Sequence, residues 1–137
     1  MARLCGNALR AFVAAFIVGL LALSGAAAQS GNPIRIGMSL ALTGAGASPS
    51  KVINTALEIW RDDVNAKGGL LGRPVELVIY DDQSTPANVP GIYTKLITVD
   101  KVDLLLVPYG TNFVAPALPT IIDNNKLTIS CTAIGIN

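Results

Sequence analysis

The sequence contains no histidine and only two cysteines, Cys5 and Cys131. Histidine is the commonest general base and metal ligand, so its absence removes the simplest route to hydrolytic or metal-assisted chemistry. Cys5 lies in a segment that we expect to be removed, which leaves one cysteine and no internal disulfide. No set of nucleophile, base and orienting residue is visible either, so the sequence predicts no enzyme, no catalytic residue, no metal and no cofactor.

Charge is also scarce and balanced. Only 14% of the residues are charged, with ten Lys and Arg against nine Asp and Glu. No basic patch stands out along the chain, and proteins that bind nucleic acid need one to contact phosphates. We therefore expect no nucleic-acid partner.

The first 28 residues have the pattern of a secretory signal peptide. Arg3 and Arg10 precede an apolar stretch at 11–23, and an Ala-x-Ala site ends at Ala28. The stretch is shorter than the roughly 20 residues of a membrane span, although an uncleaved N-terminal anchor stays an alternative. Cleavage would leave residues 29–137, enough for one small domain, in an extracytoplasmic, periplasmic location.

The remaining chain alternates between strand and helix patterns. Strands are predicted at 34–40, 75–80, 102–107 and from 127, with helices at 52–66, around 89–97 and at 113–124. Segments of this kind at crossover spacing predict an α/β fold: an open, parallel, Rossmann-like sheet flanked by helices. The apolar run at 102–107 is typical of a central strand covered on both faces.

Local signals refine the helices. Ser50 is the expected N-cap of the first helix, and Gly68 and Gly69 are expected to end it. Trp60 is expected to be a core or packing residue and not a platform for a ligand. Pro90 and Gly91 predict an irregular first turn in the second helix.

The loop LALTGAGASPS at 40–50 raises a choice between a phosphate-binding turn and the rim of a pocket. A dinucleotide loop needs G-x-G-x-x-G, but Pro49 stands where the third glycine would be. Asp81, at the end of the second strand, follows Gly44 by more than the expected spacing of about 20 residues. A dinucleotide-dependent enzyme is thus the weaker hypothesis. Asp81 and Asp82 fit helix-terminal acids better than a catalytic or metal pair.

Three segments carry a resemblance to a known family: IRIGMSLALTGAGAS, DDVNAKGGLLGRPVELVIYDDQSTP and VDLLLVPYGTNFVAPALP. Together they resemble the N-terminal lobe of type I periplasmic binding proteins of the branched-chain amino-acid type. The resemblance implies an extracytoplasmic substrate-binding protein of an ABC importer, which holds a small solute between two lobes and serves a permease in the inner membrane. A branched-chain or other amino acid, or a related carboxylate or amide, is the implied solute.

The resemblance also implies where solute contacts lie. The loops after the first, third and fourth strands are the ligand side of such a lobe, and their candidate residues are Thr43, Ser48, Tyr109, Gly110, Thr111, Asn112, Thr132, Ala133 and Ile134. Alternatives remain open for some of them. Thr43 and Thr111 fit helix caps as well, and Tyr109 fits a loop-packing role.

Length is the main departure from the family, whose members are more than twice as long. The expected assignment of residues 29–137 is therefore an incomplete, truncated first lobe. Two other hypotheses stay open, namely a ligand-sensing regulatory module of the same fold and a non-functional fragment. The residues 47–50 also stand where family members often have an aromatic side chain, which leaves the solute class open.

Overall fold

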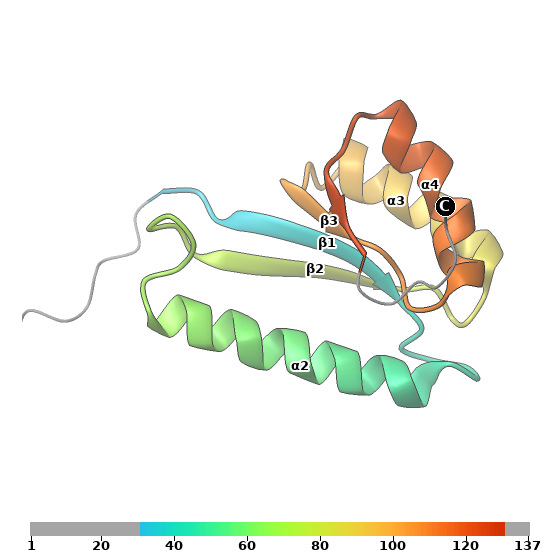
Figure 1. The fold of residues 1–137 in the computed structure, drawn as a ribbon, viewed down its shortest axis with the longest axis horizontal. Coiled ribbons are helices and arrows are strands. Elements are labelled where there is room, and N and C mark those ends of the chain that lie inside the picture. The colour runs from blue at the N-terminus through green and yellow to red at the C-terminus, as the bar shows by residue number, and fades with distance from the viewer. Residues whose placement is uncertain (1–30, 131–137) are drawn as a thin grey trace, which may run out of the picture.

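The computed structural model describes residues 31–130, which form a four-stranded parallel sheet with helices on both faces (Figure 1). The strand order is β2-β1-β3-β4, and all three pairings are parallel. The elements in chain order are β1 (Ile34–Leu40), α2 (Ala47–Ala66), β2 (Val75–Asp81), the 3₁₀ helix η1 (Pro86–Asn88), α3 (Val89–Thr98), β3 (Leu104–Leu106), α4 (Thr111–Asp123) and β4 (Thr128–Ile129). The predicted α/β fold is confirmed.

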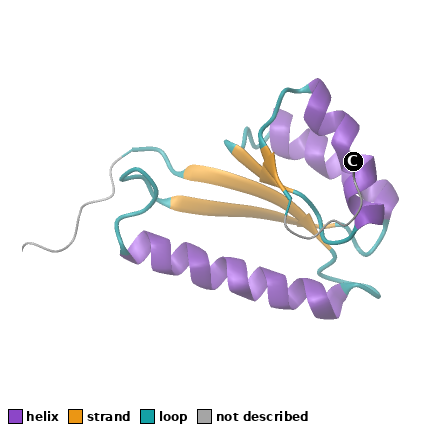
Figure 2. Cartoon of the chain, viewed as in Figure 1, coloured by secondary structure: helices purple, strands orange, loops and turns teal. Residues whose placement is uncertain are grey.

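The helices are divided unequally between the two faces. α2 lies along β1 and β2 on one face, while α3 and α4 lie together on the other (Figures 1 and 2). This division follows from connectivity, because right-handed crossovers place helices on opposite faces when the strand order reverses direction. The chain moves from β1 outward to β2 and then returns past β1 to β3, so the helix layer changes at that step.

Each face has its own apolar cluster. On the α3–α4 face, Tyr93, Leu96 and Val102 are fully buried around Leu105 of β3. Gly37 of β1 lies beneath them, and a Cβ there would meet three side chains at 3.0–3.2 Å. The cluster on the α2 face is smaller and is built around the β1 and β2 side chains Ile34, Ile36 and Val75.

Helix α2 begins five residues before the predicted start. Gly46 is its N-cap, whereas the predicted cap, Ser50, lies inside the helix and is fully buried. Pro49 occupies the third helical position, where the first turn has no intrahelical partner for an N–H group and so tolerates proline. The predicted end is confirmed: Gly68 and Gly69 have positive φ, and the Gly69 amide donates to the Val64 carbonyl at 2.9 Å.

The other helices match their predictions with shifted ends. The irregular start of the second helix is confirmed, since η1 precedes α3 and Pro90 lies in the first turn of α3. Helix α4 begins at Thr111, two residues early, behind Gly110 at φ 93°. Among residues 31–130, no helix is long and apolar enough to cross a membrane. The predicted signal peptide at 1–28 lies outside the described residues.

The third strand was predicted to be covered by helices on both faces, and this prediction was wrong. β3 is only three residues long, and Leu104 and Leu106 are half-buried, while Leu105 between them is fully buried. Within residues 31–130, helices cover β3 on the α3–α4 face alone. The apolar composition that predicted burial on both faces carries no information about which helix would cover the second face.

Candidate functional site

The carboxyl ends of the parallel strands define the candidate site, because ligands of open α/β sheets bind beyond that edge. The loop after β1 (residues 41–46) and the loop after β2 (residues 82–85) lie against each other there. The Asp82 amide donates to the Leu40 carbonyl at 3.0 Å, which places the two loops side by side at their origins.

Asp81 connects the two loops through its carboxylate. Its Oδ1 accepts from the amides of Leu42 (2.9 Å), Thr43 (3.2 Å) and Gln83 (2.8 Å). Its Oδ2 accepts from the Thr43 hydroxyl at 2.6 Å. Desolvation alone would raise the pKa of Asp81, but these hydrogen bonds together outweigh it and hold the pKa below its ordinary value.

Ser84 makes the second connection between these loops. Its hydroxyl donates to the Thr43 carbonyl at 2.7 Å and accepts from the Gly46 amide at 2.9 Å. A Cβ at Gly44 would come within 2.7 Å of the Ser84 Oγ, and Gly44 also has φ +81°. The glycine at position 44 is therefore explained by close approach to Ser84 of the neighbouring loop.

Asp82 lies behind this contact and is almost fully buried. It accepts from the Ser39 hydroxyl of β1 (2.8 Å) and from the Ser84 amide (3.0 Å). Desolvation raises the pKa of Asp82 despite these two hydrogen bonds, and the nearby Asp81 carboxylate adds to the rise. Both acids thus join loops and strands, whereas we expected them to support a helix terminus.

The described residues offer no group of three His, Cys, Asp or Glu side chains placed to hold a metal ion. The roles of Ser39 and Ser84 were missed by sequence reasoning, because single serines in a Ser-Thr-Pro or Met-Ser-Leu context carry no distinctive pattern. The glycines at 44 and 46 were the signal available in the sequence, because they indicate that another backbone or side chain comes close to this loop.

The β3 side of the edge is formed by the start of α4. Tyr109 is 44% exposed, and Thr111 and Asn112 are exposed in the first helical turn behind the half-buried Gly110. Because β3 pairs with β1, this turn and the 41–46 loop follow adjacent strands at the same edge of the sheet. Gly46 and Gly110 are the N-caps, so neither predicted threonine caps a helix.

The remaining candidates divide into two groups. Ser48 is exposed in the first turn of α2. Thr132, Ala133 and Ile134 follow β4 and lie outside the described residues.

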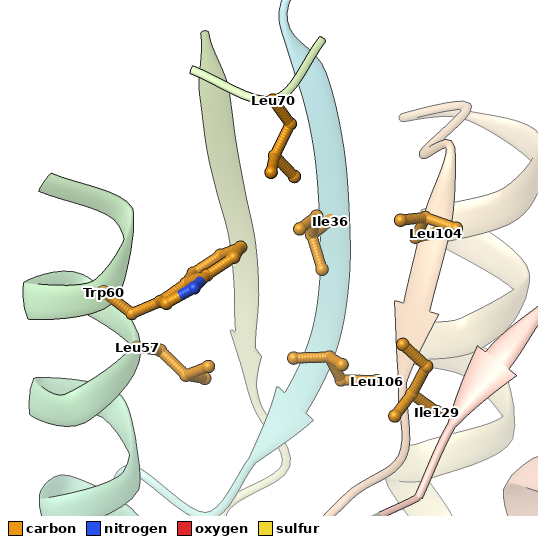
Figure 3. Close-up of a pocket in the computed structure, with 7 residues that line it drawn as sticks. All are labelled: Ile36, Leu57, Trp60, Leu70, Leu104, Leu106 and Ile129. Atoms are coloured by element: carbon orange, nitrogen blue, oxygen red, sulfur yellow. The ribbon is translucent and has the colours of Figure 1, made fainter. Parts of the chain in front are cut away.

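An apolar hollow of about 370 Å³ lies elsewhere, between α2 and the sheet. Trp60 and Leu57 on α2 point across it toward β1, β3 and β4, and its lining residues are Ile36, Leu57, Trp60, Leu70, Leu104, Leu106 and Ile129 (Figure 3). Solute sites combine apolar walls with a few placed polar groups, whereas the one polar side-chain group among these seven residues is the indole N–H of Trp60. We interpret the hollow as the half of the sheet face that α2 does not cover, which also explains why Trp60 remains 38% exposed.

Comparison with known proteins gives one family and a consistent set of structures. The family model described as periplasmic binding protein matches residues 33–136. Similar solved structures include the branched-chain amino acid transporter substrate-binding protein of Streptococcus pneumoniae in complex with isoleucine (26% identity, TM-score 0.71, covering 75% of this chain and 30% of that one). Another is a putative branched-chain amino acid ABC transporter of Rhodospirillum rubrum (25% identity, TM-score 0.71, covering 75% of this chain and 30% of that one). A third is an ABC transporter substrate-binding protein of Sphaerobacter thermophilus (29% identity, TM-score 0.67, covering 74% of this chain and 27% of that one). The chain therefore spans less than a third of the length of these structures.

Proposed function

The chain belongs to the periplasmic binding protein family, and from this premise we propose that it forms the first lobe of an extracytoplasmic substrate-binding protein of an ABC importer. The single observation that carries the proposal is the family match over residues 33–136, with 31–130 folded as one parallel α/β sheet. In this proposal residues 1–28 are a signal peptide, and residues 29–137 are part of a protein with a second lobe.

The proposed solute is small and carries a carboxylate or amide, as a branched-chain or other amino acid does. The N-terminal end of α4 supports this choice, because first-turn amides and the helix dipole favour a negative group. Thr111 and Asn112 would add polar partners beside that end, with Tyr109 exposed next to them. Contacts from Gly110, Thr43, Ser48 and residues 132–134 complete the proposed set.

A second lobe is required because one lobe covers a solute on one side only. Small-molecule sites usually bury roughly 70–90% of their ligand, which needs a second surface. Closure of two lobes around the solute would also give a permease a signal that the protein is loaded.

Isothermal titration calorimetry on the protein encoded by the full reading frame tests this proposal. The panel contains leucine, isoleucine, valine, other amino acids and small carboxylates, and saturable 1:1 heat with one class is expected. Asn112→Ala should weaken that binding, whereas Asp123→Asn, at the far end of the same helix, should not. No heat across the panel would count against a solute-binding role.

A further inference from the structure

We propose that Asp81 and Ser84 are positioning residues of the solute site, which hold the 41–46 loop in one shape before a solute arrives. The purpose of this arrangement rests on the proposed function. Its geometry rests only on hydrogen bonds within the chain, so the two ideas can fail separately.

Asp81 fixes the first half of the loop. Its carboxylate receives the amides of two consecutive residues, Leu42 and Thr43, together with the Thr43 hydroxyl. Three donors on one acceptor group set both the position and the direction of the backbone at this point. Hydrogen bonds to an ionised acceptor are also stronger than neutral ones.

Ser84 fixes the second half. Its hydroxyl bonds the carbonyl of Thr43 and the amide of Gly46, which is the N-cap of α2. One side chain therefore ties the loop to the start of the helix on which Ser48 lies. Gly44, between these two points, leaves no room for a side chain against Ser84.

The residue Ser84, which bonds the loop, is itself held by the sheet. Asp82 bonds the Ser84 amide on one side and the Ser39 hydroxyl of the central strand β1 on the other. Both the Ser39 hydroxyl and the Asp82 carboxylate are buried, so this support is shielded from water. The loop shape is thus determined by β2 and the turn that follows it, which lie outside the proposed set of solute contacts.

This arrangement has a consequence for recognition. The Thr43 hydroxyl uses its hydrogen on Asp81, so only its lone pairs remain for a solute. Thr43 can therefore accept from a solute N–H group but cannot donate to a carboxylate. A loop already in place also avoids the entropy cost of ordering on binding.

Amide hydrogen exchange and pH titration by NMR on the ¹⁵N-labelled chain test the proposal without a solute. Asp81→Ala and Ser84→Ala should accelerate exchange at Leu42, Thr43 or Gly46 by at least about tenfold, with Met38 in β1 unchanged. Glu76→Gln is the matched control, because it removes an exposed carboxylate from the same strand.

The pH titration gives a second readout, because it follows the ionisation of the Asp81 carboxylate itself and not the overall stability of the sheet. In the wild type, the amide shifts of Leu42, Thr43 and Gln83 should follow one titration below the ordinary aspartate range, since all three bond the same oxygen. Asp82 is the one ionisable side chain among residues 39–50 and 82–89, so Asp82→Asn separates its titration from that of Asp81.

Asp81→Asn keeps an acceptor oxygen, so it should retain part of the protection while the titration disappears. Wild-type exchange in Asp81→Ala, equal acceleration throughout the sheet, or no shared titration in the wild type would each overturn the proposal. If Asp81→Ala does not fold, the wild-type titration and Asp81→Asn still decide. Failure of the solute panel would leave these results unchanged.

Discussion

Replacing Gly44 with alanine should destabilise the fold by about 3–4 kcal/mol. The positive φ of +81° costs an alanine about 1–2 kcal/mol. The new Cβ would lie 2.7 Å from the Ser84 Oγ and 3.0 Å from the Gln83 carbonyl oxygen, so the serine must move. Each of the two hydrogen bonds that it would lose contributes about 1 kcal/mol. The total is a large part of the roughly 5–15 kcal/mol that stabilises a typical domain.

Two other glycines in the chain provide matched controls. Gly72 has φ +74°, and a Cβ at that position would meet no atom of the described residues within 4 Å, so Gly72→Ala measures the backbone cost alone. Gly91 lies in α3 with equally open surroundings and no positive φ, so Gly91→Ala should stabilise by about 0.5–1 kcal/mol. Urea unfolding followed by circular dichroism gives all three values, provided that the m-value stays constant.

A double variant isolates the contact itself. In a Ser84→Ala background the hydroxyl is gone, so Gly44→Ala should cost less than it does alone, and the two changes should be less than additive. The reasoning is refuted if Gly44→Ala costs no more than Gly72→Ala, or if the double variant shows the plain sum of the two single changes.

Four further predictions concern helix α2, the sheet and its edge. Ser50→Ala should stabilise the protein by about 1 kcal/mol in thermal or urea unfolding, because the buried hydroxyl has no partner among the described residues; a cap role would instead give a loss of similar size. Gly37→Ala should destabilise by about 1–3 kcal/mol, since the new methyl group would press on Leu96 and its neighbours, and an unchanged urea midpoint would contradict this packing. Asp82 has a raised pKa, so its contribution to stability should decline as pH rises from the ordinary aspartate range through the raised value, and urea midpoints measured across pH should lose this decline in Asp82→Asn. The lowered pKa of Asp81 acts with the opposite sign, because its contribution is lost as pH falls through the folded value.

Much of the fold could be predicted because its signals are local. Period-two and helical patterns gave the order of strands and helices, and Gly68 and Gly69 gave the end of α2 through a conformation that favours glycine. Pro90 likewise indicated an irregular first turn in α3, and this signal does not depend on where the helix packs. Each of these features depends on neighbouring residues only.

The errors arose where distant residues compete with local preference. Ser50 is a good N-cap by type, but it lies inside α2 and is fully buried, and Pro49 is tolerated because it falls in the first turn. The apolar β3 segment predicted cover on both faces, yet the crossover direction places α3 and α4 on the same face.

For the candidate site, the sequence by itself determined the two glycines, the acids after β2 and the polar residues before α4. Only the tertiary structure decided their relations. Asp81 and Ser84 lie about 40 residues from the loop that they bond, and pairing of β1 with β2 brings them together. A parallel sheet places the ends of neighbouring strands side by side whatever their separation in sequence. The loops after β1 and β2 therefore meet, and Gly44 lets the first loop come close to Ser84 of the second.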